Sequence, residues 1–203
     1  MHIVLIGDSV LDNASYVDSG ESIQDLLHKA IPNATISLLA VDGSMTTDIS
    51  KQIANFAQDA THIIFSCGGN DAINSIDVLN QSTSTIEDAL LTLAEIRQKF
   101  RQNYISALKL VSTLSNNVAA CTIYNKVPLL DDSSRTALAL FNEIILEELS
   151  SRQIPIIDLR VIFNDESDFS PISPIEPSVH GGRKLVLTLE KLIAADFKSG
   201  IYV

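Results

Sequence analysis

The stretch that decides the fold is "HIVLIGDS", residues 2–9 of the 203-residue chain. Its apolar core lacks the alternation of polar and apolar residues that marks a half-exposed strand. Such a run is typical of a parallel strand covered on both faces. The Gly-Asp-Ser that follows marks a turn. We therefore expect a buried strand over residues 2–6, with Ser9 exposed just beyond its carboxyl end.

Four further apolar runs have the same character, and they lie at residues 35–40, 62–67, 118–124 and 154–159. Helical periodicity is found around them, at about residues 21–31, 47–57, 86–115, 133–151 and 179–196. This alternation predicts one domain over residues 1–203, a three-layer α/β/α sandwich with a five-stranded parallel sheet and right-handed crossovers. The segment 163–178 is rich in Pro, Ser and Asp and is expected to be a long surface loop.

Composition excludes several classes of protein. The net charge is −11 and no basic cluster is present, which disfavours binding to nucleic acid. Cys67 and Cys121 have neither a disulfide framework nor zinc-site spacing, and we interpret both as small core residues. The apolar run at the start is too short for a signal peptide or a membrane span, so a cytoplasmic protein is expected. The sequence leaves the oligomeric state open.

Polar residues and glycines follow each predicted strand, at the sheet edge where α/β proteins bind ligands. Taken singly, each has a structural explanation: Asp8 and Ser9 could cap a helix, and the glycine-containing stretches could be tight turns. Asp8, Asp12, Asp71 and Asp158 could also hold an oxygen-liking cation, although their spacing does not demand one. The segments that follow the strands are Ser9, Asp42–Ser44, Gly68–Asp71, Tyr124–Asn125 and Asp158.

Taken together, these strand ends predict an oxyanion hole beside a hydroxyl group. Three donors could surround one oxygen atom: the backbone N–H groups of Ser9 and Gly43, and the side-chain amide of Asn70. Phosphate sites fit less well, because the sequence has neither GxxxxGK[ST] nor GxGxxG after its first strand.

The same three motifs, in the same order, resemble the SGNH or GDSL-type hydrolase family. They are "GDS" after the first strand, Gly43 after the second and "GGND" after the third. The resemblance implies a flavodoxin-like fold with strand order 2-1-3-4-5 and hydrolysis of a small ester or acylated substrate without a cofactor. It also implies that Ser9 is the nucleophile and that Gly43 and Asn70 stabilise the oxyanion. Val10 stands where the family usually has leucine.

The last motif departs from the family pattern D-x-x-H-P-[SN]-x-x-G. Aligned on its final residues, this chain reads "SPIEPSVHG" over 173–181. Glu176 stands in the place of the family's catalytic histidine, and Ser173 stands in the place of its aspartate. His180 lies four residues after Glu176 and could reach the site only if a helix began near Glu176.

Three interpretations of this departure stay open. Glu176 could be the base for Ser9, although an ordinary glutamate titrates near ~4.3 and would need burial to raise its pKa. His180 could be the base, oriented by Glu176. Alternatively, neither acts, and a weak or inactive relative binds an acyl or sugar ligand in the same cleft. The aligned position favours Glu176, so we expect a serine esterase or acylhydrolase that works through an acyl-enzyme at Ser9.

Overall fold

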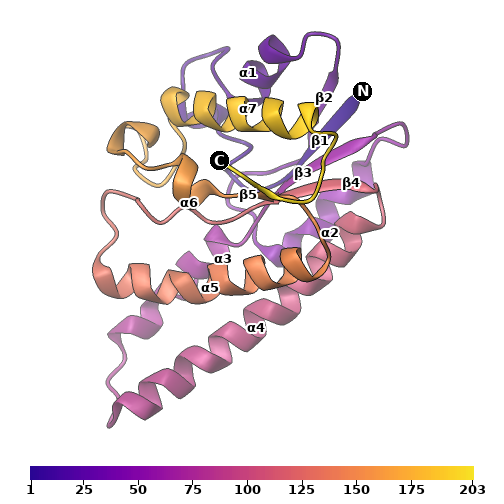
Figure 1. Cartoon of the computed structure of the whole chain (residues 1–203). Coiled ribbons are helices and arrows are strands. Elements are labelled where there is room, and N and C mark those ends of the chain that lie inside the picture. Colours follow the sequence, from indigo (N-terminus) through magenta and orange to yellow (C-terminus); the bar gives the residue numbers. More distant parts are fainter.

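A computed structural model describes all residues from Met1 to Val203 and shows a parallel sheet with helices on both faces (Figure 1). The sheet order is β2-β1-β3-β4-β5-β6, and every neighbouring pair is parallel. The predicted order 2-1-3-4-5 is confirmed. The strands are β1 His2–Gly7, β2 Thr35–Leu38, β3 His62–Ser66, β4 Asn117–Cys121, β5 Ile156–Ile157 and β6 Ile201–Tyr202.

The predicted number of five strands is wrong, because a sixth strand extends the sheet. β6 pairs with β5 through two bonds: the Ile156 N–H donates to the Gly200 carbonyl at 2.9 Å, and the Asp158 N–H donates to the Tyr202 carbonyl at 3.0 Å. Two residues are too few to produce a strand pattern in sequence. The pairing depends on the helix before it, which returns the end of the chain to the open edge of β5.

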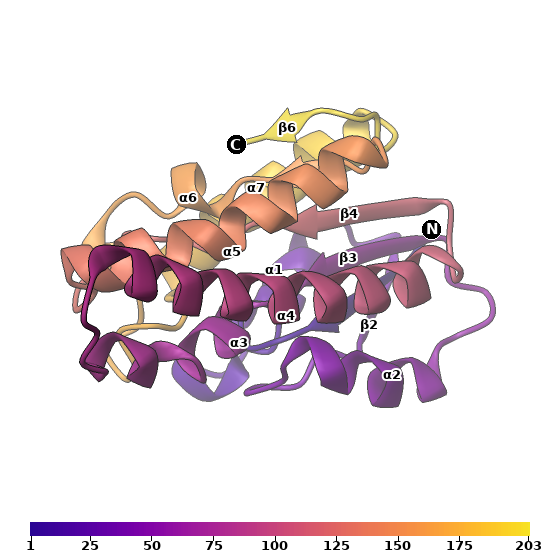
Figure 2. The ribbon, with the colours of Figure 1, turned by 90° about the horizontal axis from the view of Figure 1, so that it is seen from below.

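Helices α1 (Ile23–Ala30) and α7 (Val179–Ala194) cover one face of the sheet (Figure 1). Helices α2 (Ile49–Gln52), α4 (Ile86–Ser112) and α5 (Asp132–Ser151) cover the other face, which Figure 2 shows from below. None of the helices combines the length and the hydropathy that crossing a bilayer requires.

Two separate hydrophobic cores lie on the two faces of the sheet. Ile3 and Leu5 of β1 belong to the core under α1 and α7, whereas Val4 and Ile6 belong to the core under α4 and α5. Successive strand residues point to opposite faces, so both sets must be apolar when both faces are covered. This explains why the sequence of β1 shows no alternation.

Some helices differ from those expected. The predicted helix over 47–57 is reduced to α2, with a 3₁₀ turn on either side. Short helices α3 (Gly69–Ile73) and α6 (Leu159–Ile162) occupy segments for which no helix was predicted, because four or five residues are too few for a periodic pattern. The expected loop over 163–178 contains only one 3₁₀ turn and an isolated bridge.

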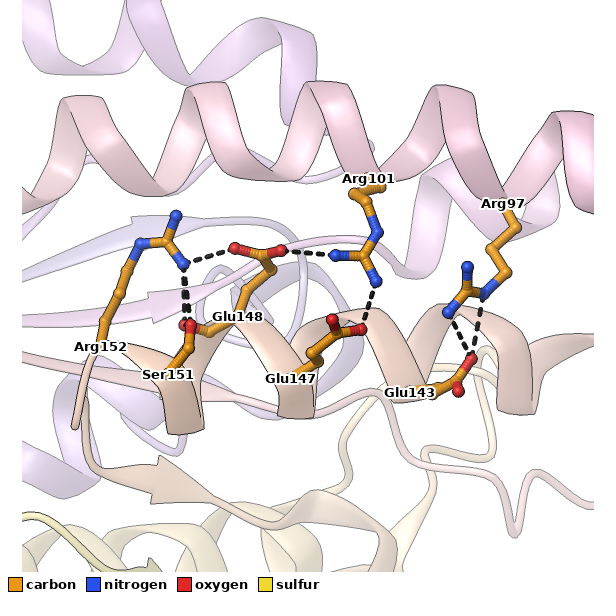
Figure 3. Close-up of polar contacts among 7 residues, drawn as sticks. All are labelled: Arg97, Arg101, Glu143, Glu147, Glu148, Ser151 and Arg152. Atoms are coloured by element: carbon orange, nitrogen blue, oxygen red, sulfur yellow. Dashed lines mark hydrogen bonds and ion pairs between the residues drawn. The ribbon is translucent and has the colours of Figure 1, made fainter.

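Ion pairs join α4 to α5 along their length (Figure 3). Glu148 of α5 has a nearly buried side chain and lies between two arginines. One carboxylate oxygen accepts from Arg101 of α4 at 2.8 Å, and the other pairs with Arg152. Arg101 also pairs with the exposed Glu147. The central carboxylate therefore links the two helices in a partly desolvated position.

We expect Glu148→Ala to lower the free energy of unfolding by about 2 kcal/mol or more, because it leaves the arginines without their buried partner. Glu147→Ala on the same helix is the matched control. It removes a half-exposed partner and should change stability much less than Glu148→Ala does. Urea unfolding at pH 7 measures both values. Equal losses in the two variants would show that the buried position of Glu148 has no special effect.

Candidate active site

The backbone at the end of β1 sets the position of Ser9. Gly7 has a φ of +137°, and the next N–H, that of Asp8, donates to the Ser66 carbonyl at 3.1 Å. The side chain of Gln52, the last residue of α2, forms two hydrogen bonds with Gly7. It accepts from the Gly7 N–H at 2.9 Å and donates to the Gly7 carbonyl at 2.7 Å. Ser9 therefore lies in the first turn after the strand. It is buried rather than exposed as expected.

The three predicted oxyanion donors follow β1, β2 and β3. Neither the Ser9 N–H nor the Gly43 N–H donates a hydrogen bond within the protein. The Asn70 side-chain amide donates to the Ser44 carbonyl at 3.0 Å, which ties α3 to the loop after β2. Ser9 and Asn70 line one cavity, and Gly43 lies outside its lining but next to Ser44. Two unpaired N–H groups and one amide are thus available at this edge of the sheet.

Glu176 lines the same cavity as Ser9 and comes from the loop before α7. The loop is held in place: the Ser170 N–H donates to the Glu176 carbonyl at 2.7 Å, and the Asn13 amide donates to the Pro177 carbonyl at 3.2 Å. The Tyr124 hydroxyl donates to the carbonyl of Ile175. These bonds direct the Glu176 side chain into the interior.

Glu176 is 6% exposed, and its buried Oε2 atom has no hydrogen-bond partner. Burial raises the pKa of Glu176 to about 7, the nearby Ser9 hydroxyl lowers it, and the charge of Asp42 raises it. Ser9 is therefore close enough for its hydroxyl group to stabilise the ionised carboxyl group. The pKa is suited to accepting a proton near neutral pH.

Asp8 is a second buried carboxyl group in the cavity. Its Oδ1 accepts from the Ser66 hydroxyl at 2.9 Å and from the Val10 N–H at 3.3 Å. Burial raises the pKa of Asp8 to about 7 against the effect of these bonds, and the charge of Glu176 raises it further. The sequence suggested only a helix cap or a share in a cation site for Asp8. Its raised pKa depends on the surrounding fold.

His180 lies on the exposed side of α7, away from the cavity of Ser9. The helix begins at Val179 with Ser178 as its N-cap, so the helical start near Glu176 that would pair the two side chains is absent. The His180 side chain is 58% exposed, with its Nε2 atom 3.6 Å from Oδ1 of the buried Asp168. It lines a different hollow together with Phe169.

The other three histidines also lie away from the cavity lining. His2 begins β1 and His62 begins β3, so both lie at the amino ends of the strands, whereas Ser9 lies beyond the carboxyl end. His28 lies on α1. Ser9 thus has carboxyl groups beside it and no imidazole.

The acidic residues considered for a metal site are engaged in hydrogen bonds or ion pairs with other groups of the protein. Asp12 accepts from the Asp42 N–H at 2.9 Å, Asp71 accepts from the Thr46 hydroxyl at 2.6 Å, and Asp158 pairs with Arg160 at 2.7 Å. The structure contains no group of three or more His, Cys, Asp or Glu side chains placed to bind a metal ion.

A cavity of about 130 Å³ extends from Ser9 between helical segments, and sequence reasoning did not identify it. Much of its wall comes from α3, the following 3₁₀ turn (Ile76–Asn80), α4 and α5, which lie on the face of the sheet opposite α1 and α7 (Figure 1). Eighteen of its 28 lining residues are hydrophobic, so it is an apolar space with polar groups at the Ser9 end. The sequence shows only apolar residues along α4 and α5, and packing decides which of their side chains leave a space.

Comparisons with known proteins identify a family and solved structures with the same fold. The profile of the GDSL-like Lipase/Acylhydrolase family matches residues 5–181. A lipolytic protein of the G-D-S-L family from Veillonella parvula is 18% identical, with a TM-score of 0.70 and coverage of 96% of this chain and 98% of that one. No curated protein matches the sequence.

Two further solved structures share the fold at low identity. The lipase Lip_vut3 from a goat rumen metagenome is 19% identical, with a TM-score of 0.73 and coverage of 98% of both chains. The acetyl xylan esterase AlAXEase is 16% identical, with a TM-score of 0.67 and coverage of 96% of this chain and 99% of that one. The similarity of these structures therefore extends over almost the whole chain.

Proposed function

The chain belongs to the GDSL-like lipase/acylhydrolase family, and from this premise we propose that it is a serine-dependent ester hydrolase with Glu176 as its general base. One observation carries the proposal: the Glu176 carboxyl group lies beside Ser9 with a buried, unpaired oxygen and a pKa raised to about 7. It occupies the sequence position of the family's histidine. A base with this pKa is ionised in a large fraction of molecules at neutral pH.

In the proposed first step, the Ser9 hydroxyl transfers its proton to Glu176 as Oγ attacks the ester carbonyl carbon. The carbonyl oxygen becomes an oxyanion, which the free N–H groups of Ser9 and Gly43 and the Asn70 amide would stabilise. Collapse of this intermediate breaks the bond to the alcohol oxygen. That oxygen leaves with the proton from Glu176, and the acyl group stays on Ser9.

In the second step, water attacks the acyl-enzyme. Glu176 accepts one proton from this water, and the same donors stabilise the second oxyanion. When the bond to Ser9 Oγ breaks, the proton returns to the serine and the carboxylic acid is released. Both steps use the same serine, carboxyl group and oxyanion donors, and the second also consumes one water molecule.

A second candidate function is ligand binding with little or no turnover. It is favoured by the lack of a histidine in the cavity lining. A carboxylate is a weaker partner for a serine hydroxyl than an imidazole, because its basicity is ordinarily lower. The two candidates differ in one property, since only the hydrolase needs an activated Ser9.

Labelling with a fluorophosphonate, followed by intact-mass measurement, tests this difference. We expect wild type to gain one phosphonyl group on Ser9 with loss of fluoride, and Ser9→Ala to gain none. Glu176→Gln should label much more slowly, whereas His180→Ala, a change remote from the cavity, should label like wild type. An unmodified wild-type protein beside a reacting esterase control would favour the ligand-binding function instead.

A further inference from the structure

The apolar cavity beside Ser9 continues away from the proposed oxyanion donors. Its polar groups, including Asp8, Asn70 and Glu176, come from the strand ends and the loop before α7. Beyond them, the walls are mainly aliphatic and aromatic, with Ser75, Arg97 and Ser134 as polar exceptions. The apolar lining includes Ile73 and Leu79 near α3, Leu93 and Ile96 of α4, and Leu138 and Phe141 of α5.

The charges around this cavity indicate a neutral, apolar occupant. Arg97 is the one basic side chain that lines it, and Glu143 of α5 pairs with this guanidinium group at 2.8 Å (Figure 3). An anionic group in the apolar part would therefore compete with Glu143 for its only cation. A polar sugar ring would leave most of its hydroxyl groups without partners, which disfavours its burial here.

The size of the cavity sets the length of the chain it can hold. Its volume is about 130 Å³. Apolar protein cavities of about 150 Å³ hold a molecule of about six carbon atoms. An acyl chain of roughly six to eight carbons would fill the space if its carbonyl group lay at Ser9.

We propose that this cavity is an acyl-chain site, and that the protein selects neutral esters of unbranched, medium-length acids over acetyl esters. The proposal rests on the hydrolase function proposed above. The carbonyl carbon would lie at Ser9 with its oxygen toward Asn70. The alkyl chain would extend between α4 and α5, and the alcohol part would remain outside the apolar space.

Two alanines of α5 allow a matched test. Ala137 lines the cavity, whereas Ala139, two residues later, is exposed and lies outside the lining. Phenylalanine at 137 should fill the space, and phenylalanine at 139 should extend into solvent. Hydrolysis of the p-nitrophenyl esters of acetic, butyric, hexanoic, octanoic and dodecanoic acid is measured for wild type and both variants.

For wild type, we expect kcat/KM to rise by up to about fourfold per methylene from acetate to hexanoate or octanoate, and to rise no further for dodecanoate. Ala137→Phe should lower the value for octanoate by about tenfold or more and change that for acetate by less than about twofold. Ala139→Phe should match wild type. A preference for acetate, or an unchanged chain-length profile in Ala137→Phe, would overturn the proposal.

A binding measurement separates failure of this proposal from failure of the hydrolase function. Methyl hexanoate should raise the melting temperature of Ser9→Ala, and methyl acetate at the same concentration should not. Ala137→Phe combined with Ser9→Ala should abolish the shift, and Ala139→Phe combined with Ser9→Ala should keep it. If wild type hydrolyses no ester but this pattern appears, the acyl-chain site stands without the reaction. Equal shifts in both double variants would overturn the site.

Discussion

Glu176→Gln is expected to lower kcat/KM for p-nitrophenyl hexanoate by about 10²- to 10⁴-fold. Glutamine has nearly the same shape as glutamate but cannot accept the Ser9 proton. The change therefore removes the proposed base while keeping the bulk of the side chain in its buried position. Initial rates over a range of ester concentrations measure the effect.

The pH profile identifies the base more specifically than the loss of rate does. Burial raises the pKa of Glu176 to about 7, and a base works only in its ionised form. For wild type, kcat/KM should rise about tenfold per pH unit below pH 7 and level off above it. The residual activity of Glu176→Gln should lack this rise. An unchanged profile in the variant would assign the titration to another group.

Stability measurements show whether the variant is merely misfolded. Because the pKa of Glu176 is higher in the folded protein than its ordinary value of 4.5, folding favours the protonated form. The stability that the protonated Glu176 contributes is fully present near pH 4 and is lost as the pH rises through about 7. Glu176→Gln should therefore match wild type near pH 4 and exceed it at pH 8 by up to about 3 kcal/mol. A Glu176→Gln variant that is less stable than wild type at pH 8 would contradict a buried carboxyl group with an unpaired oxygen.

Gly7→Ala is expected to lower the free energy of unfolding by more than about 4 kcal/mol, or to prevent folding. A Cβ atom at this position would lie 1.7 Å from the Ser66 carbonyl oxygen, and the φ of +137° is one that alanine rarely adopts. The obstructing atom belongs to the backbone of β3. Relief would require β1 and β3 to separate in the middle of the sheet.

Gly20→Ala provides the control for Gly7→Ala. Gly20 also has a positive φ, of +82°, but no atom lies within 4 Å of the Cβ position. Its substitution should cost only about 1–2 kcal/mol of backbone strain. Soluble yield and chemical unfolding compare the two variants. A similar small loss in both would contradict the close approach of Gly7 to β3, and with it the position of the turn that carries Ser9.

The sequence alone determined the main architecture and the location of the candidate site. Apolar runs such as residues 2–6 specify buried parallel strands through local composition. The residues after them are then placed at one sheet edge by topology. Ser9 and Asn70 line one cavity for this reason, and their catalytic roles remain proposals. The family motifs supplied the strand order, which no local pattern contains.

Only the tertiary structure decided which side chain lies beside Ser9. Glu176 and His180 are four residues apart, and the sequence left both open. The cap at Ser178 begins the helix too late to bring them together, and loop contacts direct Glu176 inward. The raised pKa, the short β6 strand and the apolar cavity likewise depend on segments distant in sequence. Burial and packing result from the meeting of such segments, so they cannot be determined from the local pattern of residues.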